Sequence, residues 1–258
     1  MIKYVWLLVC GNLLFFCAGS AFAQQAEDKI QTDRPDQTEA SSLVPKGNIQ
    51  IETGYLVQKD RLQEQSIKTH NYPAANMRIG LLEWAEVHVL AAIKDSVFEN
   101  GTRRRVSGVG PVVLGTKIKL WTGAGWRPEA SFIARVTLPT GNKRMSPDKP
   151  EPQFRLLFTN ELTEKLDLAY NLVYNRLEGV SLPAYTASAS YELSDTFTCF
   201  AEVFGQKEKG EAAQHQADGG VLFFLLPNLQ LDVALGWNLT KSAPYFFMTT
   251  GLSVRLPR

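Results

Sequence analysis

The chain has 258 residues, with 27 basic and 26 acidic residues, a formal net charge of +1 and a mean hydropathy of −0.13. This balance gives no basic excess for nucleic-acid binding. The sequence contains three cysteines, of which Cys10 and Cys17 lie in an apolar leader. A disulfide scaffold is therefore excluded once the leader is removed, because Cys199 would remain alone.

Residues 1–23 have the pattern of a secretory signal peptide. Lys3 is followed by an apolar run, and the segment ends in Ala21-Phe22-Ala23, a small-x-small cleavage site. The apolar run is shorter than the ~20 residues that a membrane-spanning helix needs. We therefore predict export, cleavage before Gln24 and a mature chain without net charge.

Residues 24–46 form a polar N-terminal extension punctuated by prolines, with no helical or strand period. Its centre contains Thr32, Asp33, Arg34, Pro35 and Asp36. Two interpretations are open: a plug or latch inside a lumen, or a flexible leader whose charges are solvated. In the first, Arg34 would pair with a wall carboxylate such as Glu52, and Asp33 or Asp36 with Arg135 or Arg155.

From residue 47 to the C-terminus, twelve segments alternate apolar and polar residues, as strands with one apolar face do. We predict these strands at 47–59, 71–82, 86–97, 107–120, 127–138, 152–162, 165–176, 183–193, 196–206, 214–225, 228–239 and 245–256. The second is weakened by Pro73, and the ninth is apolar on both faces at 197–203. Twelve is an even number, which suits an antiparallel sheet that closes on itself.

Three observations favour an outer-membrane barrel over a soluble β-sandwich. Short links alternate with longer polar ones, such as 60–70, 98–106 and 140–151, and short periplasmic turns opposite longer external loops are typical of such barrels. Aromatic residues gather at the strand ends, as in membrane-interface belts. Charges lie on the face opposite the aliphatic side chains, which predicts a polar lumen.

We predict that this lumen is lined by Glu52, Arg78, His88, Lys117, Arg135, Arg155, Asp167, Glu202 and Asp232. On the same face, Gly80, Gly115, Gly220 and Gly236 are expected to leave room for a solute.

The run from Thr32 to Glu39, the stretch Val44-Pro45-Lys46-Gly47 and the segment Ile51-Glu52-Thr53-Gly54-Tyr55 resemble the opening of a known family. This is the family of outer-membrane transporters named for a phenol-degradation (MetA) pathway. Leu138-Pro139-Thr140-Gly141 is a second local likeness. The resemblance implies an outer-membrane barrel, and the family name implies passage of hydrophobic or aromatic compounds.

An enzyme is the main alternative from a different functional class, for example a lipid-modifying hydrolase of the outer membrane. None of the three histidines, His70, His88 and His215, has a serine two residues away on the same strand face. No histidine–cysteine pair has metal-ligand spacing, so no metal or cofactor is predicted. Arg103-Arg104-Arg105 is either a phosphate-binding run for lipopolysaccharide or a solvated charge run.

The sequence thus predicts an all-β, antiparallel, up-and-down transmembrane barrel at residues 47–258, located in a Gram-negative outer membrane. Its expected function is passive passage of a small-molecule solute, with outer-membrane lipids around it and no nucleic acid as a partner. A sealed structural barrel without transport is the alternative, and the lipid-modifying hydrolase is the second alternative.

Overall fold

The computed structural model describes residues 29–62, 65–100 and 102–257, so the predicted signal peptide lies outside the described residues. The described residues form thirteen antiparallel strands. They are β1 (Asn48–Leu62), β2 (Gln65–Leu82), β3 (Ala85–Asn100), β4 (Thr102–Val109), β5 (Val113–Trp121), β6 (Glu129–Thr137), β7 (Glu151–Thr163), β8 (Leu166–Leu177), β9 (Val180–Ser194), β10 (Phe197–Gln206), β11 (Gln214–Leu226), β12 (Leu229–Asn238) and β13 (Phe246–Pro257). No helix among the described residues could cross a membrane.

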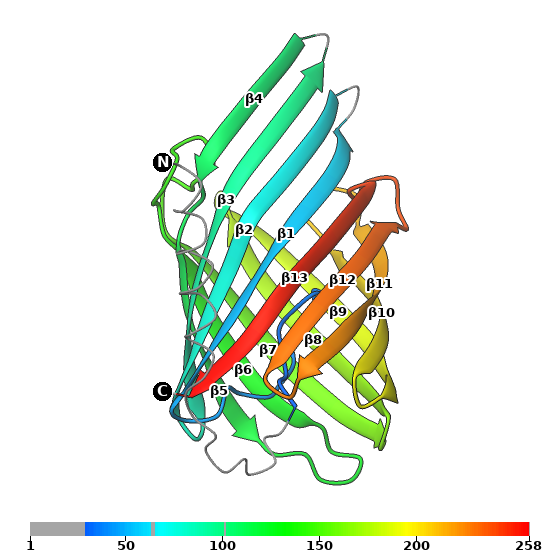
Figure 1. Ribbon diagram of the computed structural model, residues 1–258. Coiled ribbons are helices and arrows are strands. Elements are labelled where there is room, and N and C mark those ends of the chain that lie inside the picture. Colours follow the sequence, from blue (N-terminus) through cyan, green and yellow to red (C-terminus); the bar gives the residue numbers. More distant parts are fainter. Residues whose placement is uncertain (1–28, 63–64, 101, 258) are drawn as a thin grey trace, which may run out of the picture.

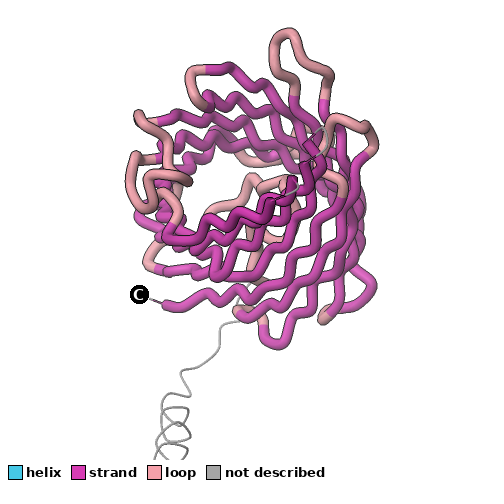
Figure 2. The backbone as a smooth tube through the Cα atoms, turned by 90° about the horizontal axis from the view of Figure 1, so that it is seen from above, coloured by secondary structure: helices cyan, strands magenta, loops and turns pink. Residues whose placement is uncertain are grey.

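The sheet closes into a barrel of twelve strand positions, confirming the predicted fold. Each strand pairs with its neighbours in sequence, and β1 closes the ring against β13 from Asn48↔Pro257 to Lys59↔Phe246. Strands β4 and β5 share one position, because both pair with β3: β4 with its second half and β5 with its first. Figure 2 shows the resulting ring of strands. Closure pairs the sheet edges, which unpaired would be costly in lipid.

The predicted strand at 107–120 is broken in two at residues 110–112. Pro111 lies in this break and has no backbone N–H with which to continue a ladder. Pro73, by contrast, does not end β2, because the register with β3 shifts between Asn71 and Ala74 and leaves it in a bulge.

The links predicted as loops at 60–70 and 98–106 are instead mostly strand. The pairing of β1 with β2 continues to Leu62↔Gln65, and that of β3 with β4 to Asn100↔Thr102. Pairing between the neighbouring strands satisfies the backbone groups of the paired residues. As a result, β1–β4 rise beyond the rest of the barrel as a four-stranded extension (Figure 1). We call this side the extension end, and the side of the tight β2–β3, β7–β8, β9–β10 and β11–β12 turns the turn end.

Most aliphatic side chains face outward and most polar ones face inward. In β8, Leu172 is 57% exposed whereas its neighbour Asn171 is 1% exposed. In β12, exposed Leu231, Val233 and Leu235 alternate with buried Gln230 and Asp232. Trp84 and Trp126 are exposed at the turn end, and Tyr174, Tyr185 and Trp237 lie toward the other end. An apolar exterior with two aromatic bands is the arrangement that a bilayer requires.

Candidate functional site

Residues 29–46, which we call the N-terminal loop, enter the barrel at the turn end and return to it. The Ile30 N–H donates to the Pro227 carbonyl at 2.7 Å, and the Gly47 N–H donates to the Gly80 carbonyl at 2.9 Å. Between these two points the chain folds into the lumen (Figure 1, blue). Ile30 and Val44 are buried there, with exposures of 1% and 2%.

Asp33 contacts the wall formed by β1, β2 and β5. Its Oδ1 lies 3.3 Å from Nη1 of Arg78 and 3.0 Å from Nζ of Lys117, and its N–H donates to Glu52 at 3.1 Å. Lys117 also donates to the carbonyls of Ala40 and Ser42. The two cations thus hold both the acidic side chain and the backbone of the N-terminal loop.

Arg34 points to the opposite wall. Its Nη2 lies 3.1 Å from Oδ1 of Asp232 and donates to Thr249 at 3.0 Å. The guanidinium lies over the cross-strand pair Gly54↔Gly251. A Cβ at Gly54 would lie 2.4 Å from Nη2 of Arg34, and one at Gly251 would lie 2.5 Å from its Nε. The two glycines therefore make the room in which Arg34 lies.

Glu39 is held by Arg135 of β6 and Arg155 of β7. It pairs with Arg135 through both carboxylate oxygens and with Nη1 of Arg155 at 3.1 Å. Its backbone is fixed in both directions by Asn171, which accepts from the Glu39 N–H at 2.8 Å and donates to its carbonyl at 3.0 Å. Burial alone would raise the pKa of Glu39, but the guanidinium groups of Arg135 and Arg155 hold it well below its ordinary value.

Asp36 lies among acidic residues. Glu202 accepts hydrogen bonds from the Gln37 N–H at 2.8 Å and from the Thr38 hydroxyl, and Glu202 faces Asp218 across the β10–β11 ladder. Burial, reinforced by the charge of Glu202, raises the pKa of Asp36 well above its ordinary value. The seated position of this part of the N-terminal loop therefore favours the protonated form of Asp36 over the charged form.

Basic side chains predominate on one side of the lumen wall, where they also pair with Glu52 and Glu86, and acidic side chains predominate on the other. Strands β2, β5, β6 and β7 carry Arg78, Lys117, Arg135 and Arg155, whereas β10, β11 and β12 carry Glu202, Asp218 and Asp232. The loop matches both sides, since Asp33 and Glu39 meet the basic wall and Arg34 meets the acidic wall. This complementarity offsets the desolvation of charges that would otherwise be buried without partners.

Most of the predicted lumen residues bind the N-terminal loop directly. Seven do so through side chains: Glu52, Arg78, Lys117, Arg135, Arg155, Glu202 and Asp232. His88 is buried behind them, with Nε2 2.6 Å from Glu86 and Nδ1 2.9 Å from Arg135. Asp167 is exposed near the turn end and is not joined to the loop. Of the N-terminal motif, Thr32 donates to the Arg34 carbonyl at 2.7 Å and Pro35 is buried.

The expected partners within this set are wrong in detail. Arg34 pairs with Asp232 rather than Glu52, and Arg135 and Arg155 bind Glu39 rather than Asp33 or Asp36. Sequence reasoning missed Glu39, although it ends the same motif, and Glu86, although it lies two residues before His88 on the same strand face.

The four glycines expected to leave room for a solute have close neighbours instead. A Cβ at Gly80 would lie 2.2 Å from the Pro45 carbonyl oxygen, and one at Gly115 would lie 2.5 Å from Cγ of Arg135. Phe200 and Phe247 occupy the corresponding positions at Gly220 and Gly236. The small residues thus admit the protein's own loop and side chains.

The histidines form no catalytic arrangement with a serine among the described residues. His70 hydrogen-bonds Tyr55, and His215 hydrogen-bonds Tyr185 at 3.0 Å. In the same part of the chain, no group of three or more His, Cys, Asp or Glu side chains is arranged to hold a metal ion.

Solved structures with the same architecture are barrels of the outer-membrane type. An outer membrane channel from Pseudomonas putida F1 has a TM-score of 0.63 at 14% identity, covering 86% of this chain and 99% of that one. The translocator domain of the autotransporter NalP from Neisseria meningitidis has a TM-score of 0.53 at 12% identity, covering 82% and 89%. The NanC porin has a TM-score of 0.50 at 8% identity, covering 81% and 100%. At these identities the likeness shows the fold.

None of the curated proteins matches the sequence. The profile of one family, described as "Putative MetA-pathway of phenol degradation", matches residues 32–256, from the N-terminal motif to the last strand. That match includes both the loop inside the lumen and the wall that holds it. The chain therefore belongs to this phenol-degradation (MetA-pathway) family of outer-membrane-type β-barrels.

Proposed function

We propose that the protein is an outer-membrane channel for passive passage of small molecules, and that its N-terminal loop is a plug that closes the lumen at rest. The observation that carries this proposal is the set of contacts around the loop. Hydrogen bonds or ion pairs join it to residues of β1, β2, β3, β5, β6, β7, β8, β9, β10, β12 and β13. A segment tied to nearly every strand obstructs the path along the axis.

The same contacts favour a plug over a flexible periplasmic leader. A mobile leader would leave its charges in water, whereas Asp33 and Glu39 are bound by buried cations. The bonds are nevertheless polar and reversible. Water or a polar solute entering the lumen offers replacement partners, so displacement costs less than unfolding a packed apolar core.

The family's description connects it with phenol degradation, which supports a small aromatic or hydrophobic solute. In a narrow lumen, the charges of Arg78, Arg135 and Arg155 on one side, where Glu52 pairs with Arg78, and that of Asp232 on the other would orient a solute that carries a polar group. Asp167 would act nearer the turn end. Electrostatics of this kind set preference among solutes in other pores.

Location in the outer membrane requires export, for which the predicted signal peptide at residues 1–23 would serve. The exposed aliphatic and aromatic exterior would face outer-membrane lipids. We place the turn end in the periplasm, since short turns lie there in barrels of this type, and the extension end outside. The N-terminal loop would then close the barrel from the periplasmic side.

The direct test removes residues 24–45 from the mature chain and measures conductance in planar bilayers. We expect larger and more frequent openings than in the full-length protein. Equal, nonzero conductance of both proteins would contradict the plug. Absence of conductance in both would instead favour the sealed structural barrel.

Solute choice is tested separately by uptake into liposomes, using a panel of aromatic acids, alkanes and sugars. Faster uptake of an aromatic solute than of a sugar of similar size would support the solute class. A rate no higher than that of protein-free liposomes, for every solute and also for the loop-deleted protein, would contradict transport. The hydrolase alternative receives no support from the hydrogen-bond partners of the histidines.

A further inference from the structure

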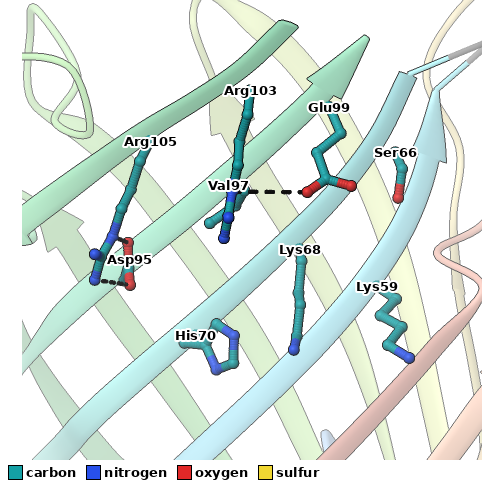
Figure 3. A pocket seen from close by; sticks show the side chains of 9 residues that line it. All are labelled: Lys59, Ser66, Lys68, His70, Asp95, Val97, Glu99, Arg103 and Arg105. Atoms are coloured by element: carbon teal, nitrogen blue, oxygen red, sulfur yellow. Dashed lines mark hydrogen bonds and ion pairs between the residues drawn. The ribbon is translucent and has the colours of Figure 1, made fainter. Parts of the chain in front are cut away.

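The outer face of the four-stranded extension carries a recess with a concentration of basic side chains. Along β3, Glu86 and His88 face the lumen, so Asp95, Val97 and Glu99, an odd number of residues away, lie on the outer face. The register then places Lys68 and Arg105 on either side of Val97, and Lys59 beside Lys68. Arg103 lies beside Glu99. Figure 3 shows these side chains together on β1–β4.

The recess has an excess of positive charge. It encloses about 600 Å³ and is lined by Lys59, Ser66, Lys68, His70, Asp95, Val97, Glu99, Arg103 and Arg105. Asp95 binds Arg105 in two hydrogen bonds of 2.8 and 2.6 Å, and Glu99 lies 3.7 Å from Arg103. Among the described residues, no ion pair joins Lys59 or Lys68 to an acid. Apart from His70, four cations face two carboxylates.

The position of the recess relative to the apolar exterior indicates its surroundings. Tyr55 and Tyr72 lie just toward the barrel on the same outer face, with ring centroids 6.1 Å apart, and the Tyr55 ring is 5.8 Å from that of His70. These tyrosines border an apolar depression lined also by Leu231 and Leu252, which belong to the outward aliphatic surface. Aromatic side chains of this kind mark the membrane interface. The basic recess thus lies further toward the extension end than this interface, at the level of lipid headgroups.

A structural reason for some of this charge is that, in the described part of the chain, β4 pairs with no strand other than β3, so its other edge has no strand partner. Charged side chains protect such edges from pairing with another chain. Edge protection accounts for arginines on β4, and Arg104 on the opposite face serves it equally well. It does not account for Lys59 and Lys68, because Lys59 is paired with Phe246 and Lys68, and Lys68 is paired with Lys59 and Val97.

We propose that this recess, formed by Lys59, Lys68, Arg103 and Arg105 on the outer face of β1–β4, binds the phosphate groups of lipopolysaccharide in the outer leaflet. Guanidinium groups bind phosphate in a two-pronged geometry, and lysines add point charges. Lipopolysaccharide places phosphates just above its acyl chains, which is where the recess lies relative to the tyrosines. The inference rests on the outer-membrane location and orientation, and does not depend on whether the channel opens.

The test measures binding of fluorescent lipid A to the full-length protein in detergent micelles. The variant K59Q/K68Q/R103Q/R105Q should bind bisphosphorylated lipid A about tenfold more weakly, since it loses four exposed cationic contacts whose effects are modest and not fully additive. The matched control is K143Q/R144Q, which removes two exposed basic residues from the 138–150 loop and should change affinity less than about twofold. Wild-type protein should bind dephosphorylated lipid A as weakly as the quadruple variant does.

A second, milder variant controls for the possibility that the quadruple variant misfolds. K59Q/K68Q leaves the Arg105–Asp95 pair intact and should lower affinity about threefold, with heat-modifiable gel migration as the check on the barrel. Equal binding by wild type and both variants would overturn the proposal. Equally tight binding of dephosphorylated lipid A or of phosphatidylglycerol would overturn it too, as would full competition by millimolar inorganic phosphate, which would indicate a site for free anions.

Discussion

At the residue scale, Arg34 illustrates how the N-terminal loop is held. Its guanidinium spans from the loop to Asp232, whose side chain is fully buried, across a gap kept open by Gly54 and Gly251. Breaking such a pair by removing one partner leaves an uncompensated charge inside the barrel. The contact is therefore expected to contribute more than a surface ion pair of the same length.

Replacement of this side chain in Arg34→Ala should loosen the loop and increase conductance in planar bilayers. We expect a weakening of the closed state by about 3 kcal/mol, because Asp232 loses its only cationic partner among the described residues. Lys29→Ala is the control: its ion pair with Glu192 is partly exposed, so it should have little effect. The charge swap R34E/D232R should restore part of the closure. Equal conductance of wild type and Arg34→Ala would show that this pair does not hold the loop.

A pH dependence follows from Asp36. Burial and the Glu202 charge raise its pKa, so a protonated Asp36 favours the seated loop. Its contribution is complete at pH values below the ordinary pKa of aspartate and is lost as pH rises through the raised pKa. The groups facing it are Glu202, Ser188 and Asp33, with Asp218 adjacent.

Conductance should accordingly increase as pH rises. Asp36→Asn, which keeps the shape and cannot ionise, should flatten this increase while conducting like wild type at low pH. The measurement is a pH series of single-channel recordings on both proteins. A slope that is the same in the variant would assign the pH dependence to another group.

At the scale of elements, the N-terminal loop depends on strands that come much later in the chain. The hydroxyls of Thr38 and Thr186 are 2.8 Å apart, joining the loop to β9. Cysteine sulfurs would take the places of these two hydroxyl oxygens, so the pair is a candidate for a disulfide. This contact allows the position of the loop to be tested without deleting it.

The double variant T38C/T186C, in a Cys199→Ser background, should form a disulfide on oxidation. The oxidised protein should remain closed, and reduction should restore the wild-type frequency of openings. Either single-cysteine variant serves as the control and should not respond to the oxidant. Failure of the cysteines to cross-link in folded protein would place the loop elsewhere.

The elements themselves were largely predictable, since a side-chain period of two is a local property of the chain. It located all twelve strand positions, and Pro73 in β2 and the apolar stretch in β10 did not disrupt them. The predictions are wrong where pairing with an adjacent strand, and not the local sequence, determines the structure. Residues 60–70 and 98–106 look like polar loops, yet pairing between adjacent strands makes them the extension.

At the scale of the whole molecule, different interactions close the sheet and fill the lumen. The wall closes through backbone pairing of β1 with β13, whereas the N-terminal loop adds polar contacts inside it. Deletion of the loop should therefore leave a folded barrel. Many loop contacts are to buried charges, so the loop-deleted barrel should be less stable.

Gel migration of heated and unheated samples tests this separation. We expect the protein lacking residues 24–45 to remain heat-modifiable, with conversion to the unfolded band at a temperature several degrees lower than for the full chain. The Lys29→Ala protein should convert at the wild-type temperature. A loop-deleted protein that migrates as unfolded before heating would make the loop part of the barrel's folding core.

The sequence by itself determined the barrel, its polar lumen face, the N-terminal motif and the family. The alternation of apolar and polar residues, the strand lengths and the motifs are all local properties of the sequence. Only the tertiary structure decided which charges meet. Arg34 and Asp232 are 198 residues apart, and Glu39 meets Arg135 and Arg155 from positions 96 and 116 residues away. Such pairings depend on where each strand falls around the ring and how deep the loop reaches, and neither has a local pattern. The basic recess on the extension arises in the same way, from four strands whose shared outer face exists only once they are paired.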